Sequence, residues 1–174
     1  GGILTEESLV RIRDSPYDDP SISFQDLHDP KEHRLTRTQF ESELNEFWVW
    51  ATETWDEIAN RIDDFDVSRL RGKWALPFFR FLGYDPSFNR ANEFIKGPTE
   101  EQSISVNLSH RGWDSDKAPR IHTIVSSDSF DSPADSDRND ISPHDALQRF
   151  LVLSKDVEWG FLFNGRYVRL LREY

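Results

Sequence analysis

The last third of the chain constrains the fold most strongly, because a helix there leads directly into a tight hairpin. Residues 142–151 carry apolar side chains at helical spacing behind a Ser-Pro start. Residues 159–172 have the pattern of two strands joined at Asn164 and Gly165. This dipeptide suits a type I′ turn, in which both central residues have positive φ. The sequence therefore predicts a helix followed by a hairpin with a two-residue turn at Asn164 and Gly165.

The alternation of side chains along this hairpin predicts which of them share a face. Phe161 and Phe163 are two residues apart and should lie on the same side of their strand. Trp159 begins the strand, and we expect it to pack beneath the hairpin against the preceding helix.

Two helices are predicted earlier in the chain. Residues 38–62 repeat apolar and aromatic side chains every three or four positions, which is typical of a helix packed on a core. Residues 68–82 have the pattern of a second helix, which Gly83 should end. Pro77 should kink or divide this second helix because it lacks a backbone N–H.

The remaining segments are shorter or polar. Residues 103–108 and 120–126 alternate as strands and are expected to be neighbours in one sheet. Residues 127–140 are rich in Ser and Asp and are expected to form a mobile loop. Residues 1–35 are broken by Asp-Pro and Ser-Pro turns and are predicted to form a polar arm, with a short helix near residues 6–13.

This order of elements indicates one α+β domain over residues 36–174. Its helical part is expected at 36–84 and its sheet part at 102–174, where a crossover helix joins strands of a mixed sheet. A chain of 174 residues is long enough for one such domain with a real core.

Composition narrows the class of protein. The formal net charge is −11, Asp outnumbers Glu, and Arg outnumbers Lys. Such a surface stays hydrated at high salt, which suggests a salt-adapted, halophilic source. The alternative is an ordinary acidic domain.

Cysteine is absent, which excludes disulfides and thiolate metal ligands. No long apolar run or signal peptide is visible, so we expect a cytoplasmic protein without a membrane partner.

Four motifs resemble the N-terminal region of large adenine-specific DNA methylases of the type IIG-like restriction–modification and phage-defence class. The resemblance covers roughly residues 74–172. Its motifs are Leu82–Tyr84, Ser109–Val125, Ser142–Leu151 and Trp159–Arg172.

The resemblance implies a restriction-endonuclease-like fold of the PD-(D/E)xK type. Enzymes with that fold hold Mg²⁺ with an Asp on one strand and an acid-x-Lys on the next. Here residues 105–110 and 120–125 contain neither an acid nor a Lys. The one acid-x-Lys, at Asp29 to Lys31, contains a proline that would prevent strand pairing. We therefore expect a degenerate domain with no catalytic residues and no metal site.

The methylase motifs are also missing from this chain, which has no Asn-Pro-Pro-Tyr motif for a flipped base. The resemblance implies that methyl transfer, and S-adenosylmethionine as its cofactor, belong to other parts of the parent protein. No cofactor is expected in this chain.

Histidines offer weaker alternatives. His110 and His122 fall on neighbouring predicted strands and could approach one another, although a metal would need further ligands. Ser109, His122 and Asp128 could form a hydrolase triad only on paper, because no nucleophile elbow surrounds Ser109. His144 near a helix start is expected to be structural, since the dipole there disfavours a cation.

Seven residues remain as candidates for contact with DNA or a partner protein. Arginine pairs bidentately with phosphates or carboxylates, so the C-terminal arginines could contact a DNA backbone or bind the chain's own acids. A second group ends a predicted strand at a polar loop. The candidates are Arg149, Arg166, Arg169 and Arg172, together with Ser109, His110 and Arg111.

These observations leave three hypotheses. The first is a non-catalytic N-terminal domain of a DNA adenine methylase that positions DNA or a partner subunit. The second is an active Mg²⁺-dependent endonuclease with displaced acids. The third is an interaction module of an unrelated, salt-adapted protein.

Thermal unfolding at different salt concentrations tests whether the acidic composition is a salt adaptation. If the Asp-rich, Lys-poor surface is an adaptation, the midpoint of thermal unfolding should rise steeply between low and molar KCl, because ions screen the repulsion among the acids. A midpoint that stays constant over this range would identify an ordinary acidic domain.

Overall fold

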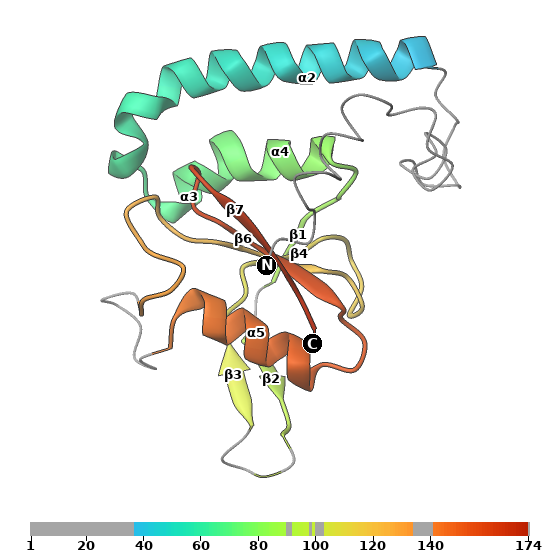
Figure 1. Ribbon diagram of the computed structural model, residues 1–174, viewed down its shortest axis with the longest axis vertical. Coiled ribbons are helices and arrows are strands. Elements are labelled where there is room, and N and C mark those ends of the chain that lie inside the picture. Colours follow the sequence, from blue (N-terminus) through green and yellow to red (C-terminus); the bar gives the residue numbers. More distant parts are fainter. Residues whose placement is uncertain (1–36, 90–91, 98, 100–102, 134–140, 174) are drawn as a thin grey trace, which may run out of the picture. The chain divides into compact units, whose positions relative to one another are not determined.

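The computed structural model describes residues 37–89, 92–97, 99, 103–133 and 141–173 (Figure 1). The chain divides into two compact units, Gly1–Glu53 and Thr54–Tyr174. The division falls inside helix α2 (Arg37–Ile58). The predicted arm over 1–35 and its short helix lie outside the described residues.

Helix α2 confirms the predicted helix over most of its length. Leu44 is 44% exposed and Trp48 is 65% exposed. Burial begins near the end of the helix, where Trp55 is half-buried and Ile58 is fully buried. The end of the helix, which belongs to the second unit, therefore packs on a core as expected.

A helical layer follows, in which Asp66 caps the first turn by accepting a hydrogen bond from the Arg69 amide at 2.7 Å. The second predicted helix is present but interrupted by a π-helical turn just before Pro77, which cannot donate a backbone hydrogen bond. Gly83 ends it with a φ of +86°, as expected. The elements are η1 (Ala59–Asp64), α3 (Val67–Leu70), the π-turn η2 (Arg71–Ala75) and α4 (Leu76–Phe81).

The main sheet has five strands in the order β1-β4-β5-β6-β7. Helix α5 (Pro143–Leu153) connects β5 to β6, and these two strands are parallel, whereas every other neighbouring pair is antiparallel. The sheet is therefore mixed and contains a crossover helix, which confirms the predicted α+β class. The strands are β1 (Ser87–Phe88), β4 (His110–Arg111), β5 (Arg120–Thr123), β6 (Trp159–Phe163) and β7 (Val168–Arg172).

One predicted strand belongs to a different sheet. Strand β3 (Ile104–Val106) pairs with β2 (Glu93–Ile95) in a separate two-stranded sheet. The expectation that residues 103–108 and 120–126 are neighbours is therefore wrong, because alternation indicates a half-buried strand without identifying its partner. Strands β1 and β2 also precede residue 102, the expected start of the sheet part. Residues 124–133 form neither helix nor strand, and the remainder of the predicted loop at 134–140 lies outside the described residues.

Strand β6 lies between the helical layer and helix α5 (Figure 1). Phe161 and Phe163 share a face, as predicted, and pack against Ala75 and Phe79 of the helical layer. Leu162 points the other way, into a cluster formed with α5. Helix α5 approaches β6 so closely that a Cβ on Gly160 would lie 2.9 Å from the Leu147 side chain.

The hairpin turn differs from the prediction by one residue. Asn164 is paired with Tyr167, because its N–H donates to the Tyr167 carbonyl at 3.2 Å. The two-residue loop is therefore Gly165 and Arg166, and Gly165 has a φ of +88°. The Asn164 side chain fixes this register, since its Oδ1 accepts hydrogen bonds from the amides of Arg166 and Tyr167. Glycine at the first loop position is typical of a type II′ turn.

Trp159 is not packed beneath the hairpin. Its side chain is 42% exposed, so the expected burial against α5 is wrong. The reason is positional: Leu162 and Gly160 face α5, and Trp159 occupies the opposite alternation.

The hairpin tip provides a sharp test of the packing. A Cβ on Gly165 would lie 2.7 Å from Ile62 Cδ1 and 2.8 Å from Leu70 Cδ1, at a φ that L-residues rarely adopt. We expect Gly165→Ala to lower the free energy of unfolding by about 1–3 kcal/mol, measured by urea denaturation.

Gly72→Ala is the matched control, because a Cβ there meets nothing within 4 Å and alanine favours the helical backbone. Its stability should equal or exceed that of the wild type. Equal stability of Gly165→Ala and the wild type would contradict the described tip.

Candidate functional site

We looked for catalytic acids in residues 105–110 and 120–125, which fall on strands β3, β4 and β5 and the loops beside them. None of these residues is an acid: β4 contains His110 and Arg111, and β5 runs from Arg120 to Thr123. A carboxylate reaches them from elsewhere, because Glu93 of β2 binds Arg120.

Glu93 and Arg120 form a buried, bidentate ion pair. Arg120 Nε lies 2.7 Å from Glu93 Oε1, and Nη2 lies 2.9 Å from Oε2. The two side chains are only 4% and 11% exposed. Asn89 Nδ2 donates to Glu93 Oε1 at 2.6 Å, and the Arg120 guanidinium also contacts the Ala118 carbonyl and lies 5.0 Å from the centre of the Phe150 ring. This pair joins the small sheet to the main one.

Both carboxylate oxygens of Glu93 are bound by Arg120, and Arg111 Nε lies 3.8 Å from Glu93 Oε1. Asp116 also approaches these strands, through its ion pair with Arg111. In the part of the chain that the structure describes, no group of three His, Asp or Glu side chains could hold a metal ion. Sequence reasoning missed Glu93 because a three-residue strand carries no alternation signal.

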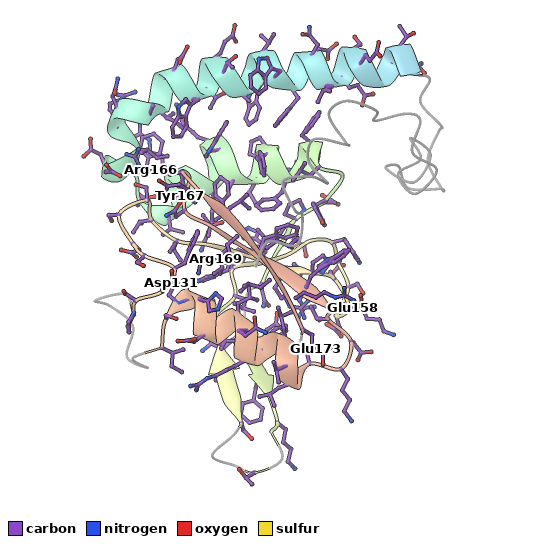
Figure 2. All side chains as sticks on the ribbon, viewed as in Figure 1. Asp131, Glu158, Arg166, Tyr167, Arg169 and Glu173 are labelled. Carbon is purple, nitrogen blue, oxygen red and sulfur yellow. The ribbon has the colours of Figure 1, made fainter. Side chains whose placement is uncertain are left out.

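Two of the three hairpin arginines, Arg166 and Arg169, form ion pairs with aspartates of the same chain. Figure 2 shows Arg169 beside Asp131. Arg166 Nη2 lies 2.9 Å from Asp63 Oδ2. Arg169 donates two hydrogen bonds to Asp131, of 2.5 and 2.9 Å. Its Cζ lies 5.1 Å from the centre of the Phe130 ring. The hydrogen bond from Arg169 lowers the pKa of Asp131, and the same bond raises the pKa of Arg169.

Asp63 receives a further contact, from the Ser126 hydroxyl at 2.5 Å. This hydrogen bond is the main reason that its pKa is lowered, with Arg166 second. His144 has a structural contact, since its Nδ1 lies 3.2 Å from Arg169 Nη1.

The four C-terminal arginines do not form one patch. Arg166 and Arg169 lie towards the turn, and Arg172 ends β7 at the other extreme of the strand. Arg149 is on α5. Arg149 and Arg172 are exposed, and within the described residues neither side chain has an ion-pair partner.

An open cavity of about 500 Å³ lies beside the turn. Serines, two aspartates and Arg169 contribute polar groups to its wall, while Phe130 and Val168 contribute apolar ones. Its lining residues are Ser126, Ser127, Asp128, Ser129, Phe130, Asp131, Asn164, Tyr167, Val168 and Arg169.

The second group of candidate contact residues is largely buried. Ser109 and His110 are 3% and 4% exposed, so neither side chain lies on the open surface. Arg111 is half-buried and bound to Asp116, with Nη1 2.6 Å from Oδ1.

The histidine pairings considered from the sequence are absent. His110 is directly opposite Ile121, so His122, one residue further along β5, faces the other side of the sheet. The Ser109 hydroxyl donates to the Ile121 carbonyl at 3.0 Å and accepts from the Thr123 amide at 3.2 Å. His122 Nδ1 instead accepts a long, 3.4 Å bond from the Ser109 backbone. Because the Ser109 hydroxyl does not bond to the His122 imidazole, the hypothetical triad of Ser109, His122 and Asp128 is not formed.

Comparison of this chain with protein-family models, curated proteins and solved structures gave no significant match. Among the helices that the structure describes, none combines the length and the apolar character needed to cross a membrane.

The Glu93–Arg120 pair should be essential for stability. Glu93→Gln removes the charge that compensates a buried guanidinium, and we expect a loss of about 3 kcal/mol of unfolding free energy in urea denaturation. The control is Glu57→Gln, which breaks an exposed 2.7 Å pair with Lys73 and should leave the midpoint unchanged. Equal midpoints for the two variants would show that the buried pair contributes nothing.

Proposed function

We propose that this chain is the non-catalytic N-terminal domain of a large DNA adenine methylase of a restriction–modification or phage-defence system, and that it positions DNA or a partner subunit. The observation that carries the proposal is the mixed sheet whose strands β4 and β5 lack acids, while Glu93 beside them is neutralised by Arg120. A five-stranded mixed sheet with a crossover helix is consistent with a restriction-endonuclease-like fold.

The absence of acids on these strands argues against hydrolysis by this domain. Metal-dependent cleavage needs at least two ligands to hold Mg²⁺, and a further group to orient the attacking water. A carboxylate bound on both oxygens has little capacity left to bind a cation. In this proposal methyl transfer, with S-adenosylmethionine as cofactor, belongs to other parts of a salt-adapted, cytoplasmic parent protein.

Two surfaces support a positioning role. Arg149 and Arg172 are exposed cations without an ion-pair partner in the described part of the chain, and could bind phosphates. On β7 and the turn before it, Tyr167, Val168 and Leu170 are exposed at 68%, 51% and 37%. Exposed aromatic and aliphatic side chains together are typical of a protein contact.

The second candidate function is an interaction module that binds no DNA. The pairing of Arg166 and Arg169 with aspartates favours it, because these arginines cannot contact phosphates without first losing their partners.

Catalysis is tested by incubating the purified chain with plasmid and linear duplex DNA in Mg²⁺ or Mn²⁺. We expect no nicking or cleavage, because strands β4 and β5 carry no acid to hold the metal. Metal-dependent nicking that disappears in Glu93→Gln would reverse this conclusion and support the active endonuclease.

DNA binding separates the two remaining functions. We expect a fluorescent duplex to bind at low KCl, and Arg149→Gln with Arg172→Gln to weaken binding and to reduce the slope of log K against log salt by roughly 1–2. Arg166→Gln is the control and should change the affinity little. An absence of binding at every KCl concentration would favour the interaction module.

A further inference from the structure

Three polar atoms on one side of the sheet lack any hydrogen-bond partner although they are removed from solvent. They are Nδ1 of His110, Oγ1 of Thr123 and Nε of Arg71. His110 is 4% exposed and Thr123 is 1% exposed. A buried polar group without a partner costs free energy, so such groups in a folded protein call for a bound water, ion or ligand.

The strand register brings these atoms together. His110 on β4 is opposite Ile121 on β5, and Thr123 lies two residues further along β5, so His110 and Thr123 share a face as diagonal neighbours. The helical layer covers this face, because Ala75 and Phe79 pack with Ile121. Arg71 belongs to the same layer, at the first residue of the π-turn and four residues before Ala75. Such π-turns often occur at functional sites.

The charges around these atoms are unbalanced. Arg71 and Arg80 are close enough to His110 to act with its burial, which is the larger cause, in lowering its pKa to about 4. Burial also lowers the pKa of Arg71. Neither arginine forms an ion pair with a described carboxylate, although the chain carries 32 acids. By contrast, Arg111 and Arg120 on the opposite face are both paired.

We propose that Arg71, Arg80 and His110 bind an oxyanion of the phosphate class on the helix-covered side of β4. A guanidinium matches the oxygens of a phosphate, and Arg71 Nε is a free donor. His110 Nδ1 would join it as a donor when the ring nitrogen carries a proton. The source is either free phosphate or the phosphate of a nucleic acid.

A neighbouring ring extends the site. Phe88 contacts His110 edge to face with ring centroids 5.4 Å apart, and Phe88 is 59% exposed. An exposed aromatic ring beside a phosphate group could stack on a base. The site does not depend on the proposed function, because it should bind inorganic phosphate whatever the parent protein does.

The first experiment follows the ring signals of His110 by NMR during pH titrations in phosphate, in sulfate and in chloride of matched ionic strength. Phosphate and sulfate should raise the pKa of His110 saturably, because a bound anion offsets the two arginines. The ring of His122, on the opposite face, is the internal reference. An unchanged His110 pKa in both oxyanions would overturn the proposal and leave a buried water as the partner of these atoms.

Substitutions identify which residues bind the phosphate. Arg71→Gln should weaken phosphate binding about tenfold or more, and Arg71→Lys should recover part of it, because charge is kept while the planar fork is lost. Arg80→Gln changes an exposed residue, so it tests the site even if Arg71→Gln does not fold. Arg166→Gln is the matched control, because Arg166 is bound to Asp63, and it should leave phosphate affinity unchanged. Equal affinities for Arg80→Gln, Arg71→Lys and the control would refute the assignment.

A competition between a DNA duplex and inorganic phosphate identifies the source of the bound phosphate. If a short DNA duplex shifts the His110 signals and inorganic phosphate displaces it, the phosphate belongs to nucleic acid. If inorganic phosphate binds and DNA produces no shift, the site takes a free phosphate, and the positioning of DNA fails separately from the anion site.

Discussion

The structure depends on the burial of strand β6 from both sides. Phe161 and Phe163 face the helical layer, while Leu162 faces α5. Because α5 joins the two parallel strands, β6 can be covered on its second face only if the helix approaches closely, and Gly160 provides the space under Leu147. The hairpin tip is held in turn by the Trp74 indole, which donates to the Gly165 carbonyl at 3.0 Å. The aromatic core, the crossover and the turn are therefore consequences of one strand with two apolar faces.

Charge is distributed differently on the two sides of the main sheet. On the side of α5, Arg120 and Arg111 form ion pairs with Glu93 and Asp116, although Arg111 Nε makes no hydrogen bond. On the side of the helical layer, His110 faces arginines that have no acid in the described part of the chain. Leaving the buried Nε of Arg71 without a partner is costly. The two sides of the sheet therefore differ: one carries paired arginines, and the other carries the proposed anion site.

The sequence predicted the long, strongly patterned elements and missed those whose signal is short or nonlocal. The helix at Pro143, capped by Ser142, and the alternation of Phe161 to Phe163 follow from local chemistry. Glu93 could not be foreseen, because its role depends on a three-residue strand and on Arg120, 27 positions away. The turn shifted by one residue because the Asn164 side chain binds two following amides, a preference that competes with the type I′ signal.

In the proposed function, the Glu93–Arg120 ion pair beside β4 and β5 stands where nucleases of the resembling class would hold a metal ion. Paramagnetic relaxation by Mn²⁺ tests it most directly, because the ion broadens the amide signals of nearby residues. We predict that Mn²⁺ leaves the amide NMR signals of His110, Arg111 and Glu93 as narrow as those of residues in the interior of β6. Selective, saturable broadening at these three residues, lost in Glu93→Gln, would contradict it and indicate a working metal site.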